Sequence, residues 1–314
     1  MIEPSCTLVS HSGNVPQSKC LTNAAENPSY RMVALDLDGT TLQSNHQLSD
    51  EQAKYLRDLH NKGFVVCIAT GRAAPSVYEH IQKLNFPRSI PVVCSNGARG
   101  LLCRTDNTKE ELFHNPVPEM IVRRAIRLGK QFGYATQYYC EEHIFANHTN
   151  DTHYHITGKY TELTGSQVCH VEDDFESLLS QGKLPSKLLI IFEDRHLKDA
   201  VHAYKAEFGS EATIVCGTYD WFLEILHPEV TKGHGLQRMC SSLNIPMEEC
   251  IAIGDGSNDV EFLQMSGLGI AMKNANDLAK KHADEVMEWT NDQNGVMKTL
   301  ERLESQGLLS FDEP

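Results

Sequence analysis

The sequence lacks any apolar run that approaches the roughly 20 residues needed to span a membrane as a helix, so we expect no membrane partner. Basic residues are also scarce: 28 Lys and Arg stand against 42 Asp and Glu, which gives a formal net charge of −14. This acidic balance argues against nucleic-acid binding, because proteins that bind nucleic acid usually present a basic surface. With 40% hydrophobic and 22% charged residues, the composition is that of a globular chain with a packed core.

The ten cysteines include no pair with C-x-x-C spacing, which disfavours a zinc ribbon or a thioredoxin-like redox motif. Cys67 and Cys94 lie in apolar runs, where a thiol packs as a small hydrophobic side chain. Free thiols suit a reducing compartment, and the first ten residues lack the basic and apolar regions of a secretory signal peptide. We therefore expect a cytoplasmic protein.

Residues 1–29 are rich in Ser, Asn and Pro and show no hydrophobic periodicity, which predicts a disordered tail. The alternative is the remnant of a peptide that targets a plastid or another organelle. Few acidic residues and many Ser and Thr suit such a peptide, whereas the absence of arginine from this segment does not.

Three short apolar runs, at residues 32–35, 65–69 and 91–94, each end abruptly in a polar turn. Helical patterns follow the first two turns, and Ser49 to Gln52 has the pattern of a capping box. Strand, polar turn and helix in alternation predict a parallel α/β sheet, in which ligands bind beyond the carboxyl ends of the strands.

The same pattern of apolar runs and polar turns is found near the C-terminus. It predicts strands at 251–253 and 269–272 and an edge strand near 283–287. Between these two parts the pattern of single strands and helices predicts an α+β insert. We therefore expect residues 30–99 and 227–310 to form a Rossmann-like core, and residues 100–226 to form a second domain inserted into it.

The first polar turn, Asp36-Leu37-Asp38-Gly39-Thr40, places two carboxylates beyond a buried strand. They can hold a hard divalent cation such as Mg²⁺, since no Cys or His lies nearby. One of them can instead attack phosphorus and form an aspartyl phosphate. The alternative is an ordinary turn, because Asp-Gly pairs are common in turns.

A second acidic turn carries Asp255 and Asp259, again just past a short apolar strand. If both turns border one crevice, several carboxylates converge, and such a group repels itself unless a cation lies among them. The two turns together therefore favour a metal site more strongly than either does alone.

Two further segments carry groups that suit an anion. Thr70-Gly71-Arg72 combines a hydroxyl with a glycine at an expected helix N-terminus, although an ordinary helix cap explains it as well. Lys232 precedes another helical run and can act as a point charge on phosphate oxygens; the alternative is a solvated surface lysine.

Taken in order, these segments resemble the motifs of the haloacid dehalogenase superfamily of phosphotransferases. Its four motifs correspond to Asp36 to Thr40, Thr70, Lys232, and Gly254 to Asp259. The resemblance covers about residues 30–305 and is closest to the Cof-type branch. Segments 70–72, 95–98, 222–225 and 269–275 match sequence patterns that are typical of that branch.

The resemblance implies a fold and a set of roles. The fold is a Rossmann-like parallel-sheet core with an inserted α+β cap of the C2 type. Asp36 is then the nucleophile, and Asp38 the general acid and base, a role that a raised pKa would suit. The resemblance further implies that Mg²⁺ is held by Asp36, the backbone carbonyl of Asp38, and Asp255. Phosphate is then bound by Thr70, Gly71, Lys232 and Asn258. Asp259 and Arg72 have supporting positions.

The expected function is a Mg²⁺-dependent phosphatase that hydrolyses a small phosphomonoester, such as a sugar phosphate, FMN or a ribityl phosphate, or pyridoxal phosphate. The alternatives are a phosphosugar mutase of the same superfamily, with Arg123, Arg124 and Arg127 as candidates for a second phosphate site, and a catalytically silent binding protein. We expect a monomer or homodimer. Four histidines in the insert, His143, His148, His153 and His155, invite a zinc interpretation, but their spacing fits incidental surface histidines better.

Overall fold

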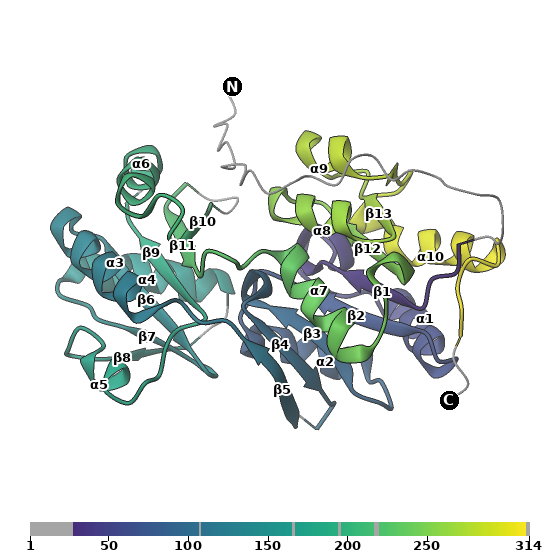
Figure 1. Ribbon diagram of the computed structural model, residues 1–314, viewed down its shortest axis with the longest axis horizontal. Helices are drawn as coiled ribbons and strands as arrows, with labels where there is room; N and C mark the ends of the chain where they lie inside the picture. The colour runs from purple at the N-terminus through teal and green to yellow at the C-terminus, as the bar shows by residue number, and fades with distance from the viewer. Residues whose placement is uncertain (1–27, 107, 165–166, 194–195, 217–219, 312–314) are drawn as a thin grey trace.

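The strands of the computed structural model, which describes residues 28–311 apart from 107, 165–166, 194–195 and 217–219, form two separate sheets (Figure 1). The tail predicted at residues 1–29 lies almost wholly outside the described residues. Within the described part of the chain, no helix is both long enough and apolar enough to cross a membrane.

The first sheet has eight strands in the order β14-β13-β12-β1-β2-β3-β4-β5. Neighbours from β14 to β3 are parallel, whereas β4 and β5 are antiparallel additions at one edge. Its strands are β1 (Met32–Leu35), β2 (Val65–Ala69), β3 (Ile90–Cys94), β4 (Arg99–Cys103), β5 (Lys109–His114), β12 (Cys250–Gly254), β13 (Leu268–Ala271) and β14 (Glu285–Val286). The predicted parallel sheet is confirmed, with β14 at its edge.

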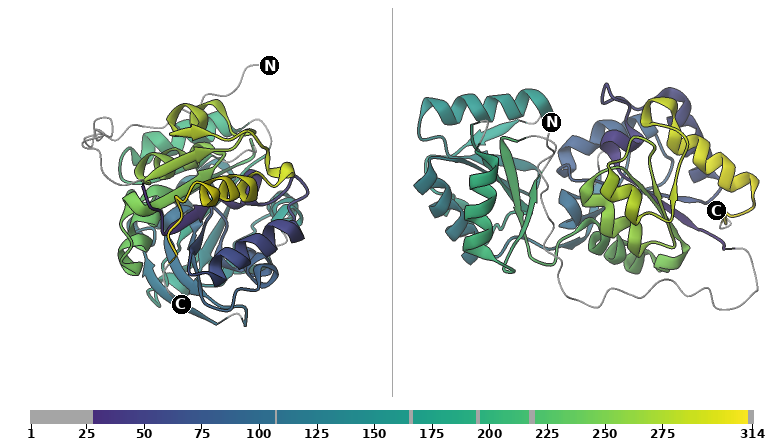
Figure 2. Two further views of the ribbon diagram at one scale, coloured as in Figure 1. Left: turned by 90° about the vertical axis from the view of Figure 1, so that its right-hand side faces the viewer. Right: turned by 90° about the horizontal axis from the view of Figure 1, so that it is seen from above.

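Helices cover both faces of this sheet, which explains why its central strands are continuous apolar runs. Three helices lie together on one face and three on the other (Figure 2). The first group is α1 (Asp50–Asn61), α2 (Tyr78–Leu84) and α10 (Gly295–Ser305); the second is α7 (Lys232–Leu243), α8 (Val260–Met265) and α9 (Asp277–His282). Short helical turns join them: η1 (Leu37–Thr41), η2 (Ala74–Val77), η3 (Ser95–Gly97), η4 (Met247–Glu249), η5 (Ser257–Asp259) and η6 (Asn291–Gln293).

The predicted capping box at the start of α1 forms only in part. The hydroxyl of Ser49 accepts the backbone N–H of Gln52 at 3.1 Å, as expected of an N-cap. The Gln52 amide, however, donates to the carbonyl of Thr41 at 2.7 Å and does not return to the cap. This glutamine ties α1 to the turn that carries Asp36 and Asp38.

The second sheet has six strands in the order β10-β11-β9-β6-β7-β8. The pair β7·β8 is parallel and the other pairs are antiparallel. Its strands are β6 (Ala135–Cys140), β7 (His143–Ala146), β8 (Val168–His170), β9 (Lys187–Ile191), β10 (Thr213–Cys216) and β11 (Phe222–Leu226). Its helices are α3 (Glu119–Phe132), α4 (Asp151–Thr164), α5 (Glu176–Leu179) and α6 (Leu197–Phe208).

The two faces of the second sheet differ. Helices α3 and α6 pack on one face, where Tyr138, Leu188 and Ile190 form a core with Tyr204. The opposite face is lined by a smaller apolar group that includes Tyr139 and Leu189 and packs against Ala73 of the first sheet's loops. This second face therefore looks toward the carboxyl ends of β1, β2 and β3.

The expected insert starts at residue 100, but β4 pairs with β3, and β5 pairs with β4, in the first sheet. The sequence analysis placed neither strand. For β5 the reason is that Lys109–His114 is a polar edge segment with little apolar patterning. The second sheet and its helices begin only after β5, with α3 at Glu119.

Candidate active site

The polar turns of four strands meet at one edge of the first sheet. Asp36 follows β1, Thr70 follows β2, Ser95 follows β3 and Asp255 follows β12. Because these strands pair in parallel, their carboxyl ends lie side by side. The predicted convergence of the two acidic turns is confirmed.

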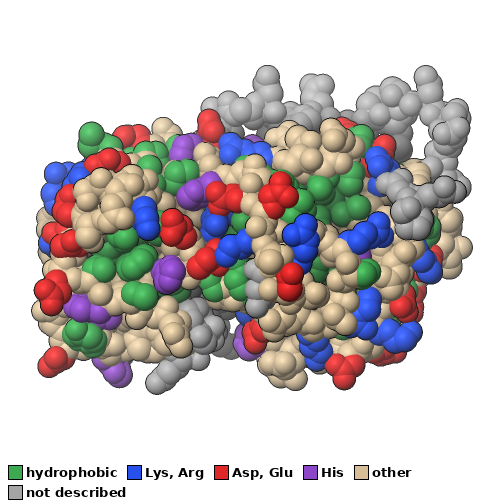
Figure 3. Space-filling model, turned by 90° about the horizontal axis from the view of Figure 1, so that it is seen from below, with side chains coloured by type: hydrophobic (Ala, Val, Ile, Leu, Met, Phe, Trp, Pro, Cys, Tyr) green, Lys and Arg blue, Asp and Glu red, His purple; other side chains and the backbone are tan. Residues whose placement is uncertain are grey.

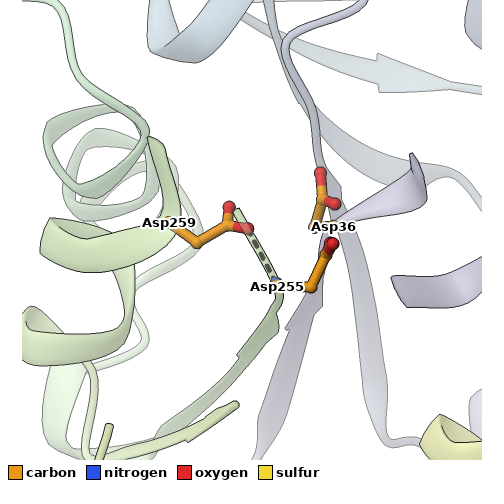
Figure 4. A group of neighbouring side chains, drawn as sticks. All are labelled: Asp36, Asp255 and Asp259. Carbon is orange, nitrogen blue, oxygen red and sulfur yellow. Dashed lines mark hydrogen bonds between the residues drawn. The ribbon is translucent and has the colours of Figure 1, made fainter. Parts of the chain in front are cut away.

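Three carboxylates form the centre of this edge. One oxygen each of Asp36, Asp255 and Asp259 lies within 4.8 Å of the others (Figure 4). The Thr40 hydroxyl donates to Asp255 at 2.8 Å. Gly39 closes the first turn at φ 75°, and a Cβ there would lie 2.3 Å from Oδ2 of Asp255, so a larger residue would displace this carboxylate.

Lys232 is the cation of this group. It is the first residue of α7, only 1% exposed, and its Nζ lies 2.6 Å from Asp36 and 2.5 Å from Asp259. The alternative of a solvated surface lysine is therefore wrong. Burial alone would lower the pKa of Lys232, but the Asp259 and Asp36 carboxylates outweigh burial and raise it.

Asp259 holds two elements together. Its second oxygen accepts the backbone N–H groups of Asp255 at 2.9 Å, the bond drawn in Figure 4, and of Gly256 at 2.8 Å. Asp259 therefore fixes both the lysine and the turn that presents Asp255. Its contact with Lys232 fits the supporting position expected for it.

The acidic cluster carries more negative charge than one lysine offsets. Burial raises the pKa of Asp36 well above its usual range, and the charges of Asp259 and Asp255 add to this against the opposing effect of Lys232. Burial and the Asp259 charge raise the pKa of Asp255 to about 6. A hard divalent cation bound by these oxygens would relieve this repulsion, so the residues present fit Mg²⁺.

Asp38 lies apart from this cluster and is paired with Arg72. The guanidinium Nε and Nη2 donate to its two oxygens at 2.7 and 2.6 Å, and a ring nitrogen of His46 lies 3.3 Å away. Burial alone would raise the pKa of Asp38, but Arg72 and His46 outweigh burial and lower it. The raised pKa that would suit a general acid is therefore not found in this arrangement, because Arg72 pairs with the Asp38 carboxylate.

Thr70 and Gly71 line the next strand end. Thr70 is buried, and its hydroxyl accepts the backbone N–H of Arg72 at 3.1 Å. The prediction that a helix begins at Thr70-Gly71-Arg72 is wrong, because the next helical turn starts at Ala74, with Ala73 as its N-cap. Gly71 leaves room for Asn96, since a Cβ on this glycine would lie 3.0 Å from the side-chain oxygen of Asn96.

Asn258 reaches the site through Asn96, a residue to which the sequence analysis assigned no role. The Asn258 amide donates to Oδ1 of Asn96 at 3.0 Å, and the Asn96 amide donates to Glu224 of the second sheet at 2.8 Å. The segments 95–98 and 222–225 matched family habits, but nothing in one sequence indicated that they meet.

Among the described residues, the acidic cluster is the one group of three or more side chains close enough to share a metal ion. His148 instead packs against the rings of Tyr154 and His170, with centroids 4.3 and 5.3 Å away. Several histidines lie on the second-sheet half of the face in Figure 3, scattered among other side chains.

A parallel sheet with acidic turns at its carboxyl ends and a second sheet inserted above them is the architecture of one class of phosphotransferases. Residues 33–300 match the model of the haloacid dehalogenase-like hydrolases, and the chain belongs to this family. The family expected from the sequence, and with it an enzyme of the hydrolase class, is confirmed.

Relatives extend over most of the chain. A putative phosphatase of Haemophilus influenzae is 30% identical over 251 residues, which cover 78% of this chain and 86% of that protein. A 5-amino-6-(5-phospho-D-ribitylamino)uracil phosphatase of Bacillus subtilis is 26% identical and covers 86% of this chain and 96% of its own. A crystal structure from Thermotoga maritima matches with a TM-score of 0.75 at 26% identity, over 87% of this chain and 97% of that one.

One relative is much longer than this chain. The chloroplastic endoribonuclease YBEY of Arabidopsis thaliana is 26% identical over 88% of this chain but only 47% of its own length. The chain therefore spans about half of that protein.

Proposed function

We propose that this protein is a Mg²⁺-dependent phosphatase that hydrolyses a small phosphomonoester through an aspartyl phosphate on Asp36. The observation that carries this proposal is the buried contact of Asp36 with Lys232, beside Asp255 and Asp259. A carboxylate held next to a lysine at the end of a parallel strand is placed to meet an anionic phosphoryl group. Family membership and relatives named as phosphatases support the same reaction.

Mg²⁺ would be held by Asp36, the backbone carbonyl of Asp38 and Asp255. When bound, it neutralises charge, so that a carboxylate and a phosphoryl group can approach each other. Gly39 fits this assignment, because its missing side chain leaves the Asp255 carboxylate in place beside the first turn.

The residues of the chain have distinct tasks. Asp36 attacks phosphorus in line and displaces the alcohol, which leaves an aspartyl phosphate. Asp38 gives a proton to the leaving oxygen and later takes one from water. Lys232, Thr70, Gly71 and Asn258 bind phosphoryl oxygens, while Asp259 positions Lys232.

Asp38 must change partners to work as an acid. Its bidentate pair with Arg72 keeps it ionised, which suits the proton-accepting half of the reaction. A substrate whose leaving group carries an anionic group competes with Asp38 for Arg72 and so favours the acid form of Asp38. Arg72 is thus a substrate contact as well as a partner of Asp38.

Residues 115–226 act as a cap that covers the site and selects the substrate. Glu142, at the tip of the β6–β7 hairpin, lies 2.7 Å from Lys109 and accepts a 2.6 Å hydrogen bond from Tyr78. These contacts seat the hairpin on the first sheet. The candidate substrates are a sugar phosphate, FMN or a ribityl phosphate, or pyridoxal phosphate.

The mutase alternative needs a free cationic site for a second phosphate. Arg123 pairs with Glu119 and Glu176, and Arg124 pairs with Glu207 and Glu211. Arg127, the third candidate, is mostly exposed and lies 4.0 Å from Glu207. This pairing favours hydrolysis over phosphate transfer between two positions of a sugar.

A screen for phosphate release tests the proposal. The purified protein is assayed with Mg²⁺ against a panel of phosphomonoesters, with p-nitrophenyl phosphate as the general substrate. Release of inorganic phosphate supports a phosphatase, isomerisation of a sugar phosphate without release supports a mutase, and no turnover of any ester supports a silent binding protein.

A further inference from the structure

A buried ion pair in the second sheet faces the candidate active site. Lys187 of β9 and Glu224 of β11 are 2% and 8% exposed and contact each other directly. Lys187 Nζ also donates to the backbone carbonyl of Gly71 at 3.1 Å. Burying two charges costs desolvation free energy, and apolar side chains would fill this face of the sheet without that cost.

The pair continues as a line of hydrogen bonds into the phosphate-binding side of the site. One oxygen of Glu224 contacts Lys187, and the other accepts the Asn96 amide at 2.8 Å. Asn96 in turn accepts the Asn258 amide at 3.0 Å. An amide nitrogen carries two hydrogens, so Asn258 keeps one N–H for a phosphoryl oxygen.

The backbone holds Asn96 in an uncommon conformation. Ser95 and Asn96 have φ values of 51° and 53°, and two non-glycine residues in succession in the left-handed region are costly. The backbone N–H of Asn96 donates to the Thr70 carbonyl at 3.1 Å, which fixes the turn to the second motif. Left-handed non-glycine residues persist where the surroundings enforce them, often at functional sites.

The direction of each bond in the line is determined by Glu224. A carboxylate only accepts, so Asn96 must present its NH₂ to Glu224 and its oxygen to Asn258. Without Glu224 the Asn96 amide is free to turn over, and it would then oppose the NH₂ of Asn258 with its own.

We infer that Glu224 is a positioning residue of the reaction: by orienting Asn96, it orients Asn258 toward the phosphoryl group. The phosphate site is then complete only when the second sheet is seated on the first. This inference rests on the proposed function, because it takes Asn258 as a phosphate ligand.

Two single variants and their combination test the donor and acceptor order. Glu224→Gln has one acceptor oxygen for two donors, Lys187 and Asn96. Asn96→Asp sets two carboxylates against each other. In the double variant N96D/E224Q, the new amide accepts from Lys187 and donates to residue 96, whose other oxygen still accepts from Asn258. Aspartate also tolerates the left-handed conformation.

The readouts are kcat and KM for p-nitrophenyl phosphate, the inhibition constant of orthophosphate, and the melting temperature. Each single variant should lose about 10-fold or more in kcat/KM, the effect of one buried hydrogen bond to a charged group, and should bind orthophosphate more weakly. The double variant should recover most of both losses, because the restored pair makes the two substitutions non-additive. Glu211→Gln, in an exposed ion pair with Arg124, is the matched control and should behave as the wild type.

Two results would overturn the inference. One is wild-type kcat/KM in Glu224→Gln. The other is a double variant that recovers the melting temperature but not kcat/KM or orthophosphate binding, since this is the behaviour of a purely structural contact. A wild-type protein without phosphatase activity refutes the proposed function and this inference together, whereas an active wild type with unaffected variants refutes the inference alone.

Discussion

Nζ of Lys232 lies 2.6 Å from Oδ1 of Asp36, although 196 residues separate them in the sequence. The contact is buried and shared with Asp259. It fixes the candidate nucleophile, and it places the positive charge where a phosphoryl group would enter.

Lys232→Met should damage both the fold and the activity. It leaves the buried carboxylates of Asp36 and Asp259 without their cation, and breaking a buried ion pair in this way costs about 3–5 kcal/mol. Urea unfolding measures the loss of stability. Lys298→Met, at a partly buried lysine over the ring of Trp289, is the matched control. An equally small change in both variants would contradict the assigned role of Lys232.

Asp38→Asn should slow turnover by about 100-fold or more, the range of general acid–base catalysis. The loss should be larger for an alkyl phosphate than for p-nitrophenyl phosphate, because an alkoxide needs protonation more than a nitrophenolate does. Steady-state kinetics with both esters measure this ratio. Equal losses for the two esters would exclude Asp38 as the acid.

Removal of Mg²⁺ with EDTA should abolish turnover, and added Mg²⁺ should restore it. Because a cation that binds only the folded state stabilises it, Mg²⁺ should also raise the melting temperature of the wild type. Asp255→Asn should lose most of this rise, whereas Asp277→Asn, at an exposed carboxylate of α9, should keep it. A full rise in Asp255→Asn would place the metal elsewhere.

His60 should make the protein less stable in mild acid. Burial, with the charge of Arg88, lowers the pKa of this imidazole from 6.5 to about 4, and its ring stacks on Phe86 at 4.3 Å. Between these two values the unfolded chain binds more protons than the folded one, so stability falls as the pH drops from about 6.5 toward 4.

The comparison with His60→Leu isolates this effect from other titrating groups. The difference in unfolding free energy between this variant and the wild type should shift by about 1–2 kcal/mol in favour of the variant from pH 7 to pH 5. Urea unfolding at both pH values measures it. A difference that stays constant between the two pH values would show that folding does not lower the pKa of His60.

Much of the parallel sheet was predictable because its strands are short apolar runs that end in polar turns. Met32–Leu35 and Val65–Ala69 were located to the residue. Strand β5 was missed, since a polar edge strand carries little hydrophobic pattern. The buried strand β4, which joins β5 to the sheet, was missed with it. The convergence of Asp36 with Asp255 was expected because each acidic turn follows an apolar strand, and parallel strands end at the same edge of a sheet.

The side-chain contacts between the site residues were harder to predict from the sequence. The Asp38–Arg72 pair reverses the direction of the expected pKa shift, and it depends on side-chain geometry that no spacing encodes. Glu224 and Asn96 meet across 128 residues, through a contact between two sheets. Such contacts are set by tertiary packing, whereas turns and caps are set locally.

Chemical trapping of the phosphorylated enzyme tests the central claim most directly. The protein is mixed with a phosphomonoester and Mg²⁺, quenched in acid within a turnover, digested and analysed by mass spectrometry, with Asp38→Asn used to prolong the intermediate. The account predicts one phosphoryl group on Asp36 in the wild type and none in an inactive but folded Asp36→Asn variant. A phosphoryl group on another residue, or undiminished turnover by Asp36→Asn, would contradict it.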